Sequence, residues 1–316
     1  MISIIIPCKN RLEQLCECLS SVYNAITYAK KKSKLFSEVE VLVINDHSDL
    51  GFAEKVLAKY PNCCVISSDG YGPGYARNLG IRLSRGEYLF FTDSDCLVDE
   101  QWIANGYNWF VESNAIVIQG IPWLFQKSLN PDYGQCEETL YEIMFSKYVE
   151  GSYTIMTDSR NLLLHRSIID YVGREIFSEK TEKATAESRV FGKKCNNLGL
   201  DVMFARNVKV YHEDPKTMQD VCRQKYRHGS GRVLIWNTVQ NFECLKSRYF
   251  EIPIEAGLPR DYILPAHASF LLGFYNNMGD NDEKRKFYNY LQGWFLQYEK
   301  RFSDYSELMD FLQYET

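Results

Sequence analysis

The fold is decided by the stretch YLFFTDSD at residues 88–95, in which an apolar run leads into two aspartates. A short continuous apolar run predicts a strand that is buried on both faces, as in a parallel sheet. Similar runs come earlier in the chain, at residues 2–6, 39–44 and 63–67. Apolar residues at helical spacing separate them, at residues 12–26, 52–59 and 75–84. Strands that alternate with helices over short connections predict an α/β fold with a mostly parallel sheet and right-handed crossovers.

Polar residues follow three of these predicted strands, at 7–10, 45–48 and 93–95. In a parallel sheet, ligands bind in the crevice at the carboxyl ends of the strands, so these residues are expected to converge there. Asp93 and Asp95 stand two positions apart, and Mn²⁺ or Mg²⁺ prefers such oxygen ligands and often shares them with substrate phosphates. The alternative is that the two aspartates only form an Asx turn.

Composition limits the class of protein. Lys and Arg number 36 and Asp and Glu 41, which gives a net charge of −5, and a mildly acidic chain argues against general nucleic-acid binding. The 10 cysteines are scattered without a framework, which favours reduced thiols in a cytosol. The N-terminus lacks a signal-peptide pattern, and no run approaches the roughly 18 apolar residues of a membrane helix. We therefore expect a cytoplasmic protein, with peripheral association at the inner face of the membrane as the alternative.

The rest of the chain is less regular. Further strands are predicted at 116–120, 161–164 and 208–211, and further helices at 136–148, 167–172, 188–196 and 218–240. Aromatic residues recur at helical spacing from Phe287 to Tyr298 and include Trp294, which predicts core packing or a homodimer contact through C-terminal helices. The expected organisation is a catalytic domain over residues 1–230, with a donor half at 1–97 and an acceptor half at 98–230. A mainly helical region follows at 231–316.

The glycine-rich segment GPGYARNLG at residues 72–80 matches neither common phosphate-binding pattern. Its glycine spacing differs from Gly-x-Gly-x-x-Gly, and it lacks the Gly-Lys-Ser/Thr end of a P-loop. Arg77 could still contact a nucleotide phosphate or the carboxylates of a metal site. The alternative is that the small residues only allow a helix to pack closely on the sheet.

Four segments, taken in this order, resemble the family 2 glycosyltransferases, which have the GT-A fold. They are SIIIPCKNR at 3–11, EVLVINDHS at 40–48, GYARNLG at 74–80 with RGEY at 85–88, and TDSDC at 92–96. Fainter similarity continues through residues 159–173, 186–199 and 208–212, so the resemblance covers about residues 1–230. It implies a metal-dependent, inverting transfer of a hexosyl or N-acetylhexosaminyl group from a nucleotide-sugar donor, a UDP-sugar, in polysaccharide biosynthesis. The acceptor, whether glycan, lipid-linked or small molecule, is not identified by any motif.

The resemblance also implies roles for individual residues. Those bordering the nucleotide would be Pro7, Asn10, Arg11, Asp46 at the base, Arg77, Asp93, Ser94, and Arg227 with Gln224 at the leaving group. The Mn²⁺ or Mg²⁺ ligands would be Asp95, Asp93 and His212. For His212 the alternative is a structural hydrogen bond at a strand end. The basic residues around Arg227 are either a diphosphate-binding patch or a solvated helix face.

The chain departs from the family pattern at three positions. Asn45 replaces the first acid of an Asp-Asp pair, Lys9 replaces a common Tyr, and Ser188 stands where the family has its catalytic acid. Inverting transfer needs a carboxylate that accepts the proton of the acceptor hydroxyl. Glu187 is the candidate base, with Glu182 or Glu179 as alternatives, while a purely structural role at a helix N-terminus is the competing interpretation. Loss of the usual acid also raises a second hypothesis, a nucleotide-sugar-binding protein without catalysis. A nucleotidyltransferase is disfavoured because its glycine-rich N-terminal loop is missing.

Overall fold

The computed structural model describes residues 1–33, 36, 38–125, 131–146, 148–154, 157–179, 187–213, 215, 217–233, 255, 257–279 and 284–289. Contacts divide the chain into two compact units. The first comprises Met1–Phe125, Phe145–Glu182 and Glu187–Glu213, and the second Gln126–Met144, Lys183–Ala186 and Asp214–Thr316. Of the described helices, none is both long enough and apolar enough to cross a membrane.

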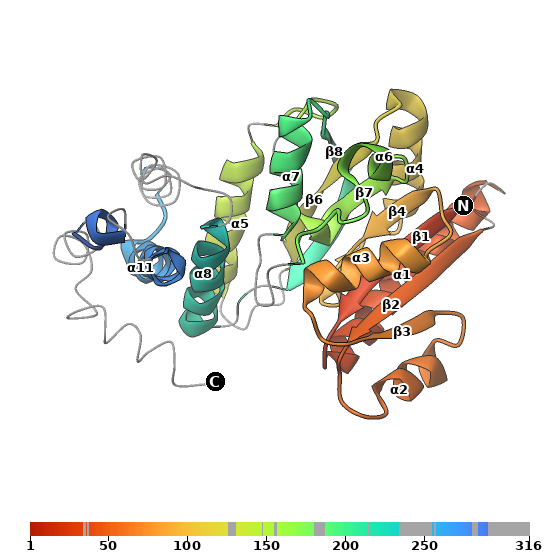
Figure 1. The fold of residues 1–316 in the computed structure, drawn as a ribbon, viewed down its shortest axis with the longest axis horizontal. Coiled ribbons are helices and arrows are strands. Elements are labelled where there is room, and N and C mark those ends of the chain that lie inside the picture. Colours follow the sequence, from red (N-terminus) through yellow and green to blue (C-terminus); the bar gives the residue numbers. More distant parts are fainter. Residues whose placement is uncertain are drawn as a thin grey trace. The chain divides into compact units, whose positions relative to one another are not determined.

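An eight-stranded sheet with the order β3-β2-β1-β4-β7-β6-β8-β5 forms the centre of the first unit (Figure 1). Its strands are β1 (Ile2–Cys8), β2 (Val39–Asp46), β3 (Cys64–Ser68), β4 (Tyr88–Phe91), β5 (Cys96–Val98), β6 (Val117–Phe125), β7 (Leu162–His165) and β8 (Met203–Glu213). The half from β3 to β4 is parallel throughout, whereas β7 pairs antiparallel with both β4 and β6, and β5 pairs antiparallel with β8. The predicted α/β class with a mostly parallel sheet is confirmed.

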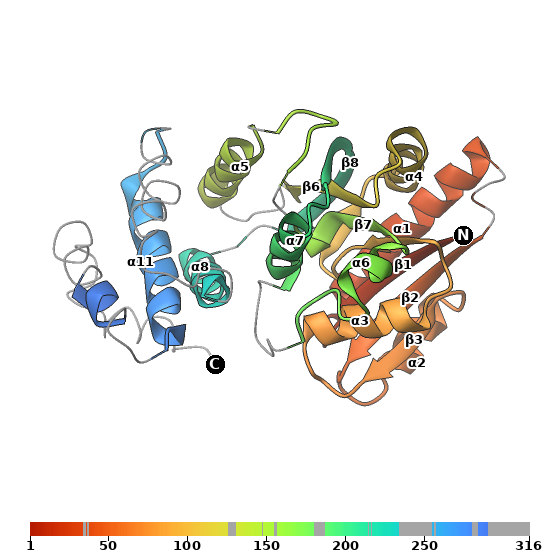
Figure 2. The same ribbon diagram turned by 45° about the horizontal axis from the view of Figure 1, so that its top comes forward.

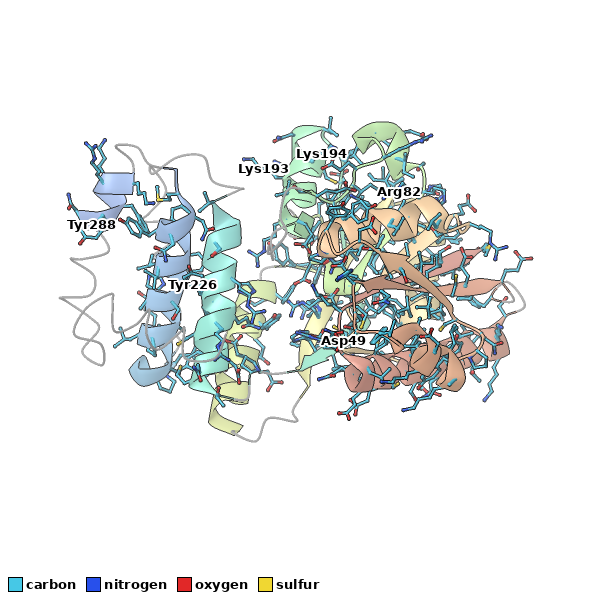
Figure 3. The ribbon with its side chains drawn as sticks, turned by 60° about the horizontal axis from the view of Figure 1, so that its bottom comes forward. Asp49, Arg82, Lys193, Lys194, Tyr226 and Tyr288 are labelled. Atoms are coloured by element: carbon cyan, nitrogen blue, oxygen red, sulfur yellow. The ribbon has the colours of Figure 1, made fainter. Side chains whose placement is uncertain are left out.

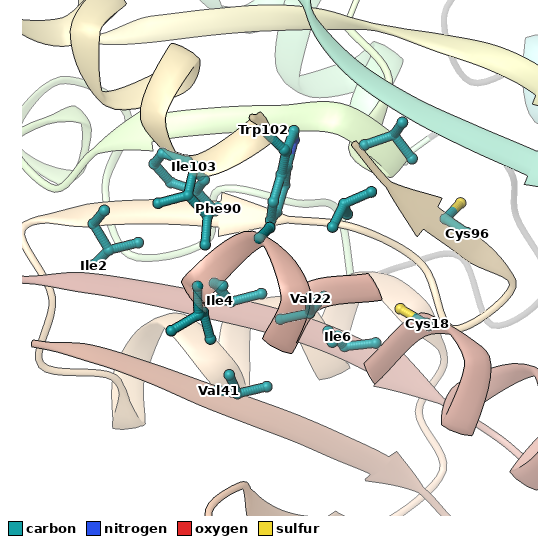
Figure 4. Packing of buried hydrophobic residues seen from close by; sticks show 14 of the residues in the cluster. Ile2, Ile4, Ile6, Cys18, Val22, Val41, Phe90, Cys96, Trp102 and Ile103 are labelled. Carbon is teal, nitrogen blue, oxygen red and sulfur yellow. The ribbon is translucent and has the colours of Figure 1, made fainter. Parts of the chain in front are cut away.

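Helices cover both faces of this sheet. They are α1 (Leu12–Lys32), α2 (Phe52–Lys59), α3 (Pro73–Leu83), α4 (Trp102–Ser113), α6 (Ile168–Val172) and α7 (Glu187–Asn197). Because side chains alternate along a strand, Ile4 and Ile6 of β1 pack with α1 and α4, as Figure 4 shows from close by, while Ile5 joins the core under α3 and α7. Continuous apolar runs are therefore required, as the sequence predicted, because both faces of each central strand are buried.

In the middle of the chain, one strand was not predicted and two strands are longer than predicted. β5 was not predicted, because three residues are too few to show a period. The strand expected at 116–120 continues through Pro122 to Phe125, and the one expected at 208–211 begins already at Met203. These two strands, β6 and β8, pair in parallel with a register shift after Gly120. The pairing provides hydrogen-bond partners for the additional residues of both strands. Pairing of this kind depends on a distant partner and leaves no local signal.

A buried amide joins three elements of the first unit. Asn161, in a short 3₁₀ turn (Ser159–Asn161), is fully buried. Its Nδ2 donates to the carbonyls of Ile121 at 3.0 Å and Val208 at 2.9 Å, and its Oδ1 accepts from Trp102 Nε1 at 2.9 Å. One side chain thus satisfies buried polar groups of β6, β8 and α4.

The second unit is helical in its described part, which agrees with the predicted helical C-terminal region. Its helices include α8 (Met218–Arg232) and α11 (Arg260–Asn277), together with all but the last residue of α5 (Pro131–Phe145), as Figure 2 shows. A Cβ on Gly229 of α8 would lie 2.0 Å from the carbonyl oxygen of Phe270, so only glycine allows this helix crossing. The predicted aromatic contact through Trp294 lies outside the described residues.

We expect Asn161→Ala to lower the free energy of unfolding by about 2–4 kcal/mol, because it removes the acceptor of the buried Trp102 indole N–H and the donor to two backbone carbonyls. Urea unfolding followed by circular dichroism measures this. Asn196→Ala, at an exposed position of α7, is the matched control and should stay within about 0.5 kcal/mol. Equal stability of the two variants would contradict the role given to Asn161.

Candidate active site

The loops that follow β1 and β2 are joined by hydrogen bonds. Asn10 has a left-handed backbone with φ of 54°, its N–H donates to Ser48 Oγ at 3.0 Å, and its Oδ1 accepts from the N–H of Asp49 at 2.8 Å. Asp49 is labelled in Figure 3 on the second of these loops. The carboxyl ends of the two strands are therefore held together before any ligand binds, as the sequence predicted for residues that follow neighbouring parallel strands.

Asp46, the predicted base-binding residue, is buried at the end of β2. Its Oδ1 accepts from Ser68 Oγ at 2.7 Å and its Oδ2 from the backbone N–H of Gly72 at 3.2 Å. The glycine-rich turn before α3 is thus attached to β2. Asn45, which departs from the family pattern, accepts the N–H of Ser48 on its Oδ1 at 3.0 Å and so stabilises the turn that follows β2. A carboxylate is not needed for that bond.

A buried arginine bridges two acids that lie far apart in the sequence. Arg77 of α3 donates through Nη2 to Asp93 Oδ1 and through Nη1 to Glu187 Oε1, both at 2.6 Å. Its side chain is only 3% exposed and lies over the ring of Phe177, 5.7 Å from the centroid. Burial raises the pKa of the Glu187 carboxyl above its usual value, against the opposing effect of the Arg77 charge. Glu187 Oε2 is buried and has no hydrogen-bond partner among the described residues.

Small and amide residues of the glycine-rich segment bring α3 close enough for this bridge. A Cβ on Gly74 would lie 2.2 Å from the carbonyl oxygen of Ser178, so a larger residue would push the chain before α7 away. Asn78 donates to the carbonyl of Phe177 at 2.7 Å and accepts its N–H at 3.0 Å. The alternative interpretation of this segment, close packing, is therefore correct for these residues, while Arg77 carries charge into the site.

Asp95 faces two different groups. On one side its Oδ1 lies 3.7 Å from His212 Nε2 and 3.9 Å from Cys96 Sγ, and on the other its Oδ2 accepts from Arg11 Nη1. The antiparallel pairing of β5 with β8 places Cys96 opposite His212. Burial raises the pKa of the Asp95 carboxyl, but the neighbouring His212 and the charges of Arg11 and Arg160 outweigh it, and the pKa lies below its usual range.

These donor atoms fit a divalent cation. The ligand atoms of Asp95, Cys96 and His212 all lie within 4.8 Å of one another, and His212 Nδ1 is buried without a hydrogen-bond partner among the described residues. Oxygen and imidazole donors suit Mn²⁺, while the thiol adds a softer donor. Asp93, predicted as a second ligand, does not group with these atoms, because its carboxylate faces Arg77.

The remaining predicted residues have varied surroundings. Pro7 is buried in β1, and Ser94 is buried between the two aspartates. Glu179, an alternative base, is already bonded to Asn78 at 2.9 Å and Arg82 at 3.4 Å, and Arg82 is labelled in Figure 3. Glu182 lies outside the described residues. Gln224 and Arg227 lie on α8, in the second unit.

Sequence reasoning missed a second acid beside the site. Asp158 accepts from Arg160 Nη2 at 2.6 Å and Nε at 3.0 Å, and the neighbouring Thr157 hydroxyl donates to the carbonyl of Ser188. Burial raises the pKa of the Asp158 carboxyl, but Arg160 and Arg189 hold it well below its usual range. No motif includes Asp158, and the hydrogen bond of Thr157 to residue 188 and the charge of Arg189 link it to the expected position of the base.

Comparison with known proteins supports the resemblance. The sequence profile described as Glycosyl transferase family 2 matches residues 3–172, just over half of the chain. The chain belongs to glycosyl transferase family 2. Among the curated glycosyltransferases that it resembles, glycosyltransferase AglE of Haloferax volcanii is 24% identical over 242 residues, which is 74% of each chain. Poly(ribitol-phosphate) β-N-acetylglucosaminyltransferase TarP of Staphylococcus aureus is 33% identical over 123 residues, which is 38% of this chain and 36% of that relative.

Solved structures share the fold. S. aureus TarS 1–349 in complex with UDP-GlcNAc matches with a TM-score of 0.55 at 17% identity, over 92% of each chain. Mannosyltransferase PcManGT from Pyrobaculum calidifontis, in complex with GDP-Man and Mn²⁺, matches with a TM-score of 0.52 at 15% identity, over 98% of this chain and 84% of that one. This family 2 member is accordingly a glycosyltransferase with the GT-A fold, as the sequence predicted.

Asp158 should make stability depend on pH. An acid whose pKa is depressed in the folded state stabilises the protein above its unfolded pKa, and this contribution is lost as pH falls through the folded pKa. We expect Asp158→Asn to lower the free energy of unfolding by about 1–3 kcal/mol at about pH 7. The difference from wild type should shrink below about pH 4. Urea unfolding over this pH range measures it, with Asp170→Asn, exposed on α6, as the control. A difference that does not change with pH would contradict the ion pair.

Proposed function

We propose that this family 2 glycosyltransferase is metal-dependent and inverting, and that it moves a sugar from a nucleoside-diphosphate sugar, a UDP-sugar, to a hydroxyl of its acceptor. The observation that carries the proposal is the meeting of Asp95 and His212 beside the Arg77 bridge between Asp93 and Glu187. Asp93 and Asp95 of the loop after β4 thus link a buried acid, Glu187, with a cation-binding group, at the sheet edge where ligands bind in parallel sheets.

Asp95 and His212 would hold the divalent cation, with Cys96 Sγ within reach. The cation would supply charge stabilisation to the departing nucleoside diphosphate. Asp46 and the turn at Gly72 would receive the base, and Asn10 and Arg11 would border the phosphates. The name of the TarS complex with UDP-GlcNAc supports a UDP-sugar, and the name of the PcManGT complex with GDP-Man and Mn²⁺ supports use of a divalent cation.

Glu187 is our proposed base. Arg77 fixes its Oε1, while Oε2 is without a partner among the described residues and can accept the proton of an attacking hydroxyl. Burial, which raises the pKa of Glu187, makes this carboxyl a stronger base than an exposed glutamate. Asp158 is the competing acid, but its depressed pKa makes it a weak base. If neither serves, the chain is the non-catalytic nucleotide-sugar-binding protein that Ser188 suggests.

The names of relatives indicate a class of acceptor. Both TarP and a Bacillus spizizenii enzyme that is 30% identical over 145 residues are named for transfer to poly(ribitol-phosphate). The chain spans only 36% and 22% of these two relatives, so their acceptors come to this chain as a proposal alone. We propose a polyhydroxylated polymer as the acceptor class, in line with the role in polysaccharide biosynthesis that the sequence suggested.

Nucleotide binding tests the donor site. We expect calorimetry to show that UDP binds more tightly than GDP or dTDP, and that it needs Mn²⁺, since EDTA would remove the cation that Asp95 and His212 would hold and with it the charge that would attract the diphosphate. Asp95→Ala should weaken UDP binding at least about tenfold, while Asp170→Ala should leave it unchanged. Absence of binding by any nucleotide under either condition would contradict the proposed donor site.

Release of UDP from UDP-GlcNAc, with water as acceptor, tests the base. Glu187→Gln should bind UDP with an affinity within about threefold of wild type and release it at least about 100-fold more slowly. The wild-type rate should fall as pH drops through the Glu187 pKa, above the usual glutamate value of about 4.3, because the base must be ionised. A full rate in Glu187→Gln with loss in Asp158→Asn would move the role to Asp158. UDP binding without any release by wild type would support the non-catalytic alternative.

A further inference from the structure

The two aspartates of the loop after β4 are each paired with an arginine, but the two arginines differ in freedom. The Arg77 side chain is 3% exposed and forms ion pairs with both Glu187 and Asp93. Its guanidinium is therefore held in place by two partners in a buried position. Arg11 pairs with Asp95, and its side chain is 48% exposed. The Arg77 pair is therefore a fixed part of the core, whereas Arg11 can exchange one anionic partner for another.

The backbone of Arg11 is fixed even though its side chain is exposed. Its carbonyl accepts the N–H of Leu15 at 2.8 Å in the first turn of α1, and the preceding Asn10 is bonded to the loop after β2. Any movement of Arg11 is consequently confined to its side-chain torsions. The guanidinium can reorient while its point of attachment stays at the start of α1.

Arg11 donates a hydrogen bond to the carboxylate that would bind the cation. The Oδ1 side of Asp95 faces His212 Nε2 and Cys96 Sγ, and Arg11 Nη1 donates to Oδ2 of the same group. A divalent cation at Asp95 and His212 would place two positive charges close to the guanidinium. Like charges a few ångströms apart repel by several kcal/mol near a protein surface. Arg11 and the cation therefore compete for one negative charge.

We propose that Arg11 is a mobile counter-ion of the metal site, which neutralises Asp95 in the free protein and moves to the diphosphate when cation and nucleotide bind together. This inference rests on the proposed function. A guanidinium pairs well with phosphate oxygens, so the group released from Asp95 finds a new partner only when the nucleotide is present. Arg11 thereby links the two binding events, and the cation should bind weakly without nucleotide and tightly with it.

The opposite role for Arg11 makes the opposite prediction. An arginine that stays on Oδ2 while the cation binds Oδ1 would orient the carboxylate, and its removal would weaken cation binding. In the mobile role, its removal frees Asp95 and strengthens cation binding in the absence of nucleotide. The sign of the change in Mn²⁺ affinity therefore separates the two roles.

The experiment measures Mn²⁺ binding by the full chain, without UDP and with saturating UDP, from the electron paramagnetic resonance signal of free Mn²⁺. We expect Arg11→Gln to bind Mn²⁺ alone about tenfold more tightly than wild type, and to show a smaller gain from UDP than wild type shows. Arg11→Lys, which keeps the charge, should lie between them. Arg85→Gln is the control, because Arg85 is 76% exposed and pairs with Glu40 at 3.1 Å, away from the aspartates.

The outcomes are distinct. If wild type binds Mn²⁺ with UDP but Arg11→Gln binds Mn²⁺ alone no more tightly than wild type, Arg11 is not a counter-ion and the inference is overturned while the proposed function stands. If wild type binds no Mn²⁺ even with UDP, the proposed metal dependence fails and the inference fails with it. An equal gain in Arg85→Gln would show a general effect of charge and would also overturn the inference.

Discussion

The ion pairs of Arg77 are the constraint on which the rest of the site depends. A guanidinium that is almost fully buried must have its charge compensated, and here Asp93 and Glu187 each give one oxygen at 2.6 Å. Removing one partner of such a pair typically costs several kcal/mol, because a buried charge is left uncompensated. This single side chain therefore fixes α3, the aspartate loop after β4 and the start of α7 relative to one another.

The family motifs divide into residues that pack and residues that carry chemistry. Asn78 is hydrogen-bonded to the backbone of Phe177, and Gly74 lies close to the backbone of Ser178. These contacts allow the helix that carries Arg77 to approach α7. Arg166, in the fainter part of the resemblance, donates to the carbonyls of Gly86, Ile81 and Ser84 and so ties the end of β7 to the turn before β4. Such motif residues position the acids, but they need not touch a substrate.

The acidic side chains of the site differ in pKa because burial and neighbouring charges act on them to different extents. Burial raises the pKa of Glu187, while neighbouring positive charges outweigh burial and depress the pKa values of Asp95 and Asp158. A depressed pKa suits a ligand or counter-ion that must stay ionised, and a raised one suits a group that accepts and returns a proton. These opposite shifts agree with Asp95 as the cation ligand and Glu187 as the base in our proposal.

The sequence alone determined the parallel half of the sheet and the loops that carry the acids. Strands buried on both faces need continuous apolar runs, and four motifs in order indicated the family, so Asp46, Asp93 and Asp95 were placed at strand ends from local signals. The tertiary structure decided which groups meet. The three-residue strand β5, the position of Cys96 opposite His212 and the bridge from Arg77 to Glu187 have no local period or spacing. They arise because an ion pair or a strand pairing joins residues far apart in the chain, and its free energy depends on burial and geometry that only the folded protein creates.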